Sequence, residues 1–181
     1  MNAMWKVHWG ATVRRRVLAA AVFAHLVAFA GSAPAQDAVA VKANPLAPFE
    51  RLVGGQWHLG DSYQEFEWGV GRLSIKATSY FVVDGQPLLV SEGTWYWHPE
   101  ANVIKGTFTA VEMPASLFEY ETRFQADTML SELTTYDSAG NKKTYVERWK
   151  FLDDAHFEWT LFRKTDNELL QEMQGTYVRS D

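Results

Sequence analysis

Short runs rich in Val, Ile, Thr, Phe, Tyr and Trp fill the chain from residue 56 onward, and turn-forming residues separate them about every ten residues. The breaks include "DGQP" at Asp84, "HPEAN" at His98, "SAGN" at Ser138 and "DD" at Asp153, all of which suit hairpin connections. This pattern predicts about ten antiparallel strands, each joined to the next. The expected strands cover residues 56–59, 63–68, 72–83, 87–97, 103–113, 117–126, 128–136, 143–152, 156–163 and 169–178.

Alternation along these runs indicates which side chains face the interior, since successive side chains of a strand point to opposite faces. No helical segment is available to cover a second face, so the strands are expected to close on themselves. The sequence therefore predicts an all-β fold, a meandering antiparallel barrel. We expect Lys76, Arg148 and Lys150 to point outward, and Leu73, Ile75, Ala77, Phe118, Tyr120, Thr122, Phe124, Tyr145, Trp149, Phe151, Phe157, Trp159 and Leu161 to point inward.

One short helix is expected before the first strand, in the stretch "NPLAPFERLVGG". Asn44 is a suitable N-cap, Pro45 suits the first helical position, and a pair of glycines ends the segment. These features predict a helix over residues 45–53. We expect a flexible leader over residues 36–44 and a single barrel domain over residues 45–181.

The segment "GQW", which ends at Trp57, opens the first expected strand directly after the helix. This order of short helix, GxW motif and β-meander resembles the calycin superfamily, and it looks most like the uncharacterised lipocalin-like domains of bacteria. The resemblance implies a calycin-like barrel, and the lipocalins and fatty-acid-binding proteins of this superfamily carry small apolar molecules. It also implies a structural Trp57 at the closed end of the barrel, covered by an Arg of a late strand. Arg179 and Arg163 are the alternatives for that cation.

Cofactor and metal chemistry find little support in the sequence. The nitrobindins, which are haem-binding calycins, hold iron through a His near the end of the chain, but the stretch "ELLQEMQGTYVR" contains none. After residue 36 the only His residues are His58, His98 and His156, each beside a turn and without the spacing of a metal site. The chain also lacks a GxSxG elbow, a P-loop, a GxGxxG motif and any Cys. We expect no cofactor, no metal and no catalytic residue of these types.

The N-terminal residues have the three regions of an export signal in the usual order. "VRRR" at residues 13–16 is basic, and residues 17–30 form an apolar run that is shorter than the about 20 residues a membrane span needs. Residues 33–35 match the small-x-small pattern of signal peptidase, which predicts cleavage between Ala35 and Gln36. We therefore expect a signal peptide over residues 1–35 and a periplasmic or secreted protein without a membrane anchor. The Sec route is favoured, although "VRRR" also resembles a twin-arginine signal.

Removal of this signal leaves an acidic chain. Four of the 17 Lys and Arg residues precede Gln36 and none of the 22 Asp and Glu residues does, so 13 basic residues remain against 22 acidic ones, a net charge near -9. Such a charge repels phosphate backbones, and no basic run is present to bind anionic lipid. We expect no nucleic-acid partner.

Polar residues in the apolar rows are the first candidates for a binding site, because a barrel of about ten strands is wider than its side chains can fill. Glu147 lies in one row with Tyr145 and Trp149, and a buried charge needs a partner. Either Glu147 forms an internal ion pair with Arg163, or it anchors the polar group of a ligand.

The stretch "EGTWYWHPE" contributes further candidates. Either Trp95 and Trp97 face the interior, or Tyr96 does together with Glu92, and we favour the first alternative. The candidate ligand-binding residues are Trp95, Trp97, Tyr120, Tyr145, Glu147, Trp149, Trp159 and Arg163.

Three classes of function are compatible with this sequence. The favoured one is an exported barrel that binds or carries a small apolar molecule in its interior. The alternatives are a structural or protein-interaction module with a filled barrel, and a cavity enzyme that uses Glu147 or Glu92 as acid or base.

Overall fold

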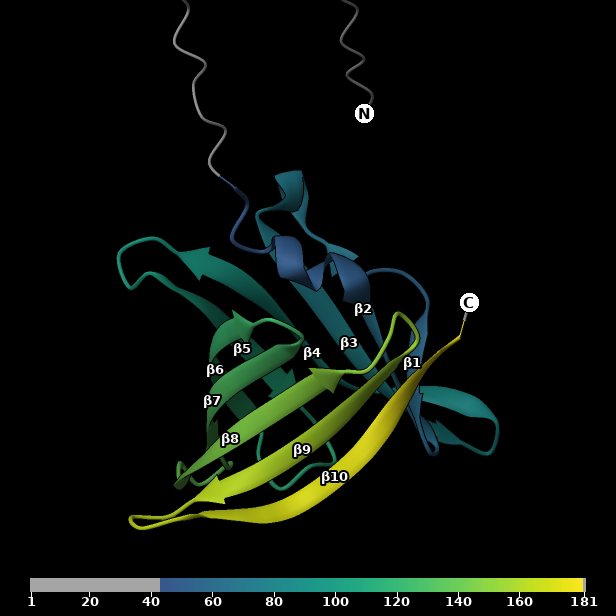
Figure 1. Cartoon of the computed structure of the whole chain (residues 1–181). Helices are drawn as coiled ribbons and strands as arrows, with labels where there is room; N and C mark the ends of the chain where they lie inside the picture. The colour runs from purple at the N-terminus through teal and green to yellow at the C-terminus, as the bar shows by residue number, and fades with distance from the viewer. Residues whose placement is uncertain (1–42, 181) are drawn as a thin grey trace, which may run out of the picture. The chain divides into compact units, whose positions relative to one another are not determined.

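Ten antiparallel strands close into a barrel in the computed structural model of this chain, which describes residues 43–180 (Figure 1). The expected signal peptide, its cleavage site and most of the expected leader lie outside the described residues. The elements are η1 (Ala47–Leu52), β1 (Gln56–Leu59), β2 (Ser62–Trp68), η2 (Val70–Arg72), β3 (Ser74–Val83), β4 (Gln86–His98), β5 (Val103–Ala110), β6 (Leu117–Gln125), β7 (Thr128–Tyr136), β8 (Lys142–Phe151), β9 (His156–Lys164) and β10 (Leu169–Ser180).

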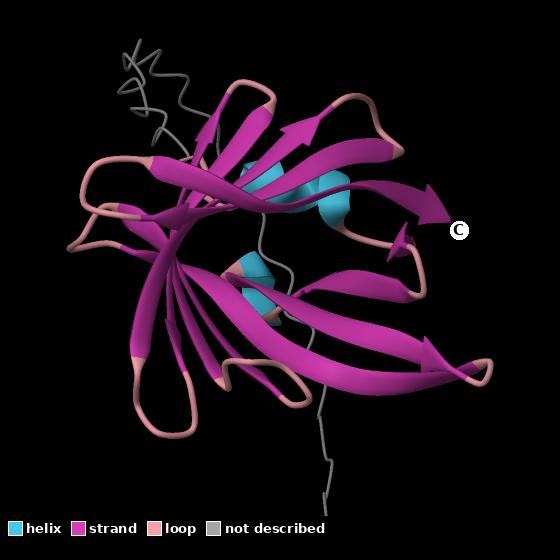
Figure 2. Ribbon diagram, turned by 90° about the horizontal axis from the view of Figure 1, so that it is seen from below, coloured by secondary structure: helices cyan, strands magenta, loops and turns pink. Residues whose placement is uncertain are grey.

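Each strand pairs with the next one along the chain, and β1 also pairs with β10 to close the ring. Figure 2 looks into the barrel from the end opposite η1, with the strands around the ring and η1 at the far end. The closing pair is short, because β1 has four residues and pairs only with residues 178–180 of β10. This topology confirms the predicted all-β fold and closed meander, and it is compatible with a calycin-like barrel.

All ten expected strands are present, and their ends differ from the expected ones by at most three residues. The helix differs more: η1 is a 3₁₀ helix of six residues that begins at Ala47. The Asn44 Oδ1 accepts a hydrogen bond from the Leu46 backbone N–H at 2.9 Å, so Asn44 stabilises a turn ahead of η1 instead of capping the helix itself. The inward position predicted for Leu73 is wrong. Leu73 is 76% exposed because β3 begins only at Ser74 and the alternation of the strand does not reach back to it.

The remaining inward rows follow the prediction. Thr122 of β6 and Phe157 of β9 are buried, and Lys76, Arg148 and Lys150 are exposed, as their positions in the alternation predict. The structure also decides between the alternatives for β4. Trp95 is buried, Trp97 is partly buried against the core, and Tyr96 is exposed, so the favoured alternative is confirmed. Glu92 lies in the outward row with Tyr96 and is exposed.

The helix η1 covers one end of the barrel through its buried Phe49 and Leu52. The Trp57 Nε1–H donates a hydrogen bond to the Leu52 carbonyl oxygen at 2.9 Å, which ties the first strand to this helix. The Arg179 guanidinium lies 5.6 Å from the centre of the Trp57 ring and donates to the Val53 carbonyl oxygen at 3.0 Å. Arg179 is therefore the cation that covers Trp57, and this end of the barrel is closed.

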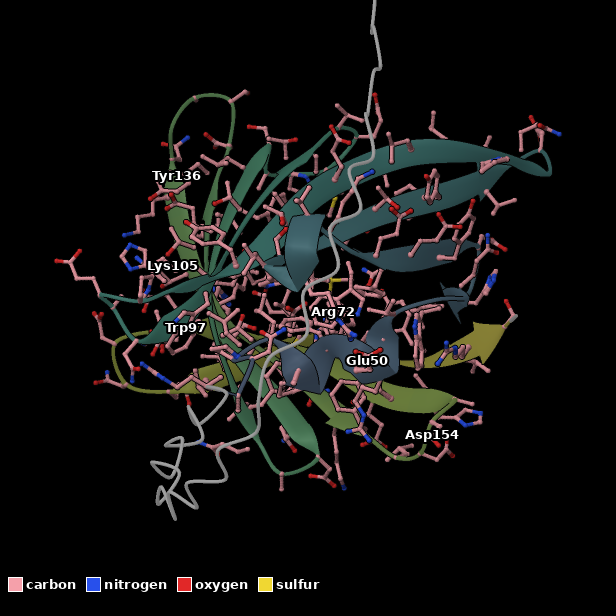
Figure 3. The ribbon with its side chains drawn as sticks, turned by 90° about the horizontal axis from the view of Figure 1, so that it is seen from above. Glu50, Arg72, Trp97, Lys105, Tyr136 and Asp154 are labelled. Atoms are coloured by element: carbon pink, nitrogen blue, oxygen red, sulfur yellow. The ribbon has the colours of Figure 1, made fainter. Side chains whose placement is uncertain are left out.

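A second contact fastens the loop between β2 and β3 to the same end. Arg72 forms an ion pair with Glu50 of η1, and Figure 3 shows these two side chains near each other above the barrel. The Arg72 guanidinium also lies 4.3 Å from the centre of the Trp68 ring. The ion pair is exposed and contributes little stability, so its main effect is to position the loop. Within residues 43–180, no helix has the length and apolarity that a membrane span requires.

Candidate functional site

A cavity of about 290 Å³ lies inside the barrel, and all ten strands contribute to its wall. Its lining includes Phe81, Met113 and Met173, which are partly exposed and lie near the β3–β4, β5–β6 and β9–β10 connections. These connections lie at the end of the barrel opposite η1 (Figure 1). The cavity therefore opens at that end, while η1 and Trp57 close the other. The volume is close to the lower limit of small-molecule sites, which is about 300 Å³.

Aromatic side chains form the inner wall of this cavity. The Trp95 ring lies 4.4 Å from the Phe108 ring and 5.7 Å from the Tyr120 ring, measured between centroids, and it meets Trp149 edge-on at 6.3 Å. Gly106 of β5 lies opposite Trp95, and a Cβ atom at Gly106 would lie only 2.6 Å from the indole. The glycine therefore leaves room for the Trp95 ring against the barrel wall, and the packed rings form a wide apolar surface.

Glu147 of β8 is the buried carboxyl of this wall. It shares the inward row of Trp149 and is only 7% exposed. The Trp159 Nε1–H of the neighbouring strand β9 donates a hydrogen bond to Glu147 Oε1 at 2.5 Å. The second oxygen, Oε2, is buried and has no hydrogen-bond partner in the described structure. A buried carboxylate oxygen without a donor is costly, so this site has an unfilled position for a hydrogen-bond donor.

The electrostatics of the cavity follow from this burial. Burial raises the pKa of the Glu147 carboxyl above its usual range, and the indole N–H groups of Trp159 and Trp149 act in the opposite direction. Burial and the Glu147 charge also hold the pKa of the Tyr120 phenol well above its usual value. The same two causes raise the pKa of Tyr177. Both phenols therefore stay neutral beside the carboxyl.

Five of the eight candidate binding residues line this cavity: Trp95, Tyr120, Glu147, Trp149 and Trp159. Trp97 does not, because it is two residues nearer the closed end of β4 and packs against the hydrophobic core there. Tyr145 is half-buried in the row of Glu147, but it lies nearer the open rim and outside the cavity lining.

The predicted internal ion pair between Glu147 and Arg163 is wrong. Arg163 lies at the rim with its side chain half exposed, in a shallow surface groove between β8 and β9. Its Nε–H group pairs with the Glu172 carboxylate at 2.6 Å. Glu172 is the extra residue of a β-bulge in β10, between Gln171 and Met173, and the bulge places this carboxylate beside the guanidinium. Arg163 consequently contacts neither Glu147 nor Trp57.

Tyr177 and Phe108 line the cavity but are not among the candidate residues from the sequence. Tyr177 of β10 lies opposite Phe157 in the β9–β10 register, and the two rings stack at 4.7 Å. Apolar and polar residues also alternate in "QGTYV" of β10. Once β10 is paired with β9, this alternation places Tyr177 in the inward row beside Phe157. Phe108 belongs to "KGTFTA", whose alternation of apolar and small residues is weaker.

The His residues and Glu92 are placed away from the cavity. His98 Nδ1 accepts a hydrogen bond from the Ala101 backbone N–H at 3.1 Å, and His156 Nδ1 lies 2.9 Å from the Asp153 carboxylate, both at turns. Among residues 43–180, no group of three or more His, Cys, Asp and Glu side chains forms a metal site. Because Glu92 is exposed on the outer face, its proposed role as an acid or base of the cavity is wrong.

No protein family matches the sequence, and no curated protein matches it.

Proposed function

We propose that this protein is exported and that its barrel binds a small apolar molecule in the interior. The observation that carries this proposal is the 290 Å³ cavity, which has a wall of aromatic side chains and an opening at one end. Sites for small molecules are typically concave and mostly apolar, with a few polar groups that orient the ligand. The resemblance to calycins, whose members carry small apolar molecules in such barrels, supports the same function.

The alternative of a structural module requires a filled barrel, and the cavity is an argument against it. Trp95 of β4 and Trp149 of β8 meet edge-on across the interior at 6.3 Å, but these rings fill only part of it, because the cavity that both of them line remains. An empty apolar cavity costs stability in proportion to its volume. Space of this kind in a barrel is consistent with a ligand that compensates for that cost.

A cavity enzyme is the second candidate, and the raised pKa of Glu147 favours it, since perturbed carboxyls occur at catalytic sites. Binding needs no more than this one carboxyl and the aromatic wall. Acid–base catalysis would in addition need groups that hold the reacting atoms of a substrate at a defined distance from Glu147. We therefore place binding first.

The test of the binding function uses Ser91→Leu in the mature protein. Ser91 of β4 is half-buried and lines the cavity, so a leucine there adds volume inside the barrel. Titration with the neutral apolar fluorophore N-phenyl-1-naphthylamine is expected to give saturable fluorescence with the native protein. We expect Ser91→Leu to weaken this binding by about tenfold, because the added side chain overlaps the ligand position.

Thr109→Leu is the matched control for this test. Thr109 lies on the neighbouring strand β5, is exposed and points outward, so the same leucine there leaves the cavity unchanged. Thr109→Leu should bind the fluorophore as the native protein does. Equal affinity of Ser91→Leu and the native protein, with equal melting temperatures, would place the fluorophore outside the barrel and contradict the proposal.

A further inference from the structure

Glu147 is an acidic residue in a cavity wall that contains no basic side chain. The lining described above contains Tyr, Trp, Phe, Met, aliphatic residues, Ser and Gln, and no Lys, Arg or His belongs to it within residues 43–180. Because burial keeps the phenols of Tyr120 and Tyr177 neutral, Glu147 is the one carboxyl of this lining and the group that can give it a negative charge. A carboxylate or phosphate of a ligand would meet repulsion here and no compensating cation.

Glu147 Oε2 can accept a hydrogen bond from a ligand donor, beside the influence that the Trp149 indole N–H has on this carboxyl. Trp159 occupies Oε1, and Oε2 is buried and unpartnered at the cavity wall. An ionised carboxylate only accepts hydrogen bonds, so a ligand group that is itself only an acceptor cannot bind Oε2. An ammonium group supplies both an N–H donor and a compensating charge, and hydrogen bonds between charged groups are the stronger kind.

The rings around Glu147 suit the same group. Trp149 and Tyr177 are nearly parallel, with centroids 6.5 Å apart, and each stacks one face on Phe157, which leaves the other face to the cavity. Trp95 approaches Trp149 edge-on. The faces of Trp and Tyr rings carry negative electrostatic potential, and they attract organic cations most strongly where water is excluded. A carboxylate within such an aromatic enclosure is a site for an organic ammonium ion.

We propose that the ligand of this barrel is an organic amine with an apolar body, and that its protonated nitrogen binds Glu147 Oε2. The inference rests on the proposed binding function and specifies its ligand class. The nitrogen lies at Glu147 beside the aromatic wall, and the apolar body extends toward Phe118 and Met113 near the open end. The neutral hydroxyl of an alcohol would supply a donor without the charge, so the two head groups are distinguishable by affinity.

Ionisation of Glu147 is necessary for this binding. The groups that face Glu147 are the phenols of Tyr120 on β6 and Tyr177 on β10, the indole of Trp159 on β9, and Ser131 of β7, which lies opposite in the register. None of these groups becomes charged near neutral pH. The rim cation Arg163 is paired with Glu172 and faces away. Amine affinity is therefore expected to fall as the pH drops through the pKa of Glu147, which burial has raised.

The experiment compares octylamine, 1-octanol and octanoate, which share one tail and differ in the head group, by calorimetric titration of the mature protein at about pH 8, where the amine is protonated. Octylamine is expected to bind at least about tenfold more tightly than 1-octanol, and octanoate to bind most weakly. Glu147→Gln keeps the acceptor for Trp159 but removes the charge, so it should remove the preference for octylamine over 1-octanol.

Glu158→Gln serves as the charge control, because Glu158 is exposed on the outer face of β9. This variant should keep the full preference for octylamine. Equal affinities for octylamine and 1-octanol, tighter binding of octanoate, or an unaltered preference in Glu147→Gln would each overturn the amine inference while the binding function stands. If neither the three probes nor N-phenyl-1-naphthylamine binds, the binding function fails as well.

Discussion

At the scale of single residues, the buried carboxyl of Glu147 lowers the stability of the folded protein but favours the binding of a ligand. Its carboxyl is buried among indoles and phenols, with one hydrogen bond from Trp159 and one free oxygen. Replacing a buried charge that lacks a partner by a neutral group of the same shape commonly stabilises a protein. Retaining the acid costs the empty barrel stability, and a ligand with a donor group offsets that cost.

The stability of the protein should therefore depend on pH through Glu147. The folded state holds the Glu147 proton to a higher pH than the unfolded chain, because its pKa is raised on folding. Folding stability from this group thus falls as the pH rises from the usual carboxyl pKa through the raised value. We expect Glu147→Gln to raise the melting temperature at about pH 8, and to do so much less below about pH 4, where the native carboxyl is protonated.

Thermal unfolding of the native protein, Glu147→Gln and the control Glu158→Gln over this pH range measures the effect. Glu158 is exposed, so its substitution should shift the melting temperature little at either pH. A Glu147→Gln variant that is less stable than the native protein at high pH would show that the carboxylate has a stabilising partner.

At the scale of elements, alternation was sufficient to predict the strands, their sequential pairing and most inward residues. Runs such as those of β6 and β9 have hydrophobic residues with a period of two, and this period is present in the structure of both strands. The prediction failed for Leu73 because alternation does not mark the residue at which a strand begins. It failed for Arg163 because the bulge at Glu172, which changes the register by one residue, has no sequence signature of its own.

The strand count predicted enclosed space, but the size and the full lining of the cavity lay beyond sequence reasoning. The inward rows of Trp95, Tyr120, Glu147 and Trp149 were predictable, but whether opposite rows touch depends on the barrel's closure and on ring orientations. Gly106 illustrates the point, since its missing side chain sets the depth at which the Trp95 ring lies. Such volumes result from all ten strands together.

The closed end of the barrel depends on Trp57, which connects η1, β1 and β10. Its side chain is 1% exposed, packs 5.0 Å from the Phe157 ring and is covered by Arg179. We expect Trp57→Ala to lower the free energy of unfolding by about 3 to 5 kcal/mol, because it leaves a large cavity and an unpaired Leu52 carbonyl. Urea unfolding measures this loss.

Trp68→Ala provides the comparison for that measurement. Trp68 is only partly buried and lies under Arg72 at the surface of the same end, so its removal should cost distinctly less. Equal losses for the two variants would show that Trp57 has no special part in closing the barrel.

At the scale of the whole molecule, the net charge favours the same class of ligand as the cavity does. The net charge near -9 of the chain after Gln36 attracts cations and disfavours anions around the protein. This long-range preference has the same sign as the preference of the cavity for an ammonium group.

Export is testable by the mass of the protein recovered from the periplasm or medium. We expect a chain that begins at Gln36, because residues 33–35 fit signal peptidase. Ala35→Arg should block this cleavage, since a large charged residue does not fit the small-residue position, and the precursor should stay with the membrane fraction. Recovery of an intact chain from Met1 outside the membrane fraction would contradict the predicted signal.

The shortest strand of the barrel also determines when the barrel can be finished. β1 pairs with β10 over three residues, and these two strands stand at opposite ends of the described sequence. Every other pair consists of strands that are adjacent in sequence, so its pairing closes only a short loop. The β1–β10 pair needs both the first and the last strand, and its pairing closes the longest loop of the chain. We therefore expect it to be the last contact that forms during folding and, because only three residues of β1 are paired, the first to separate in local unfolding.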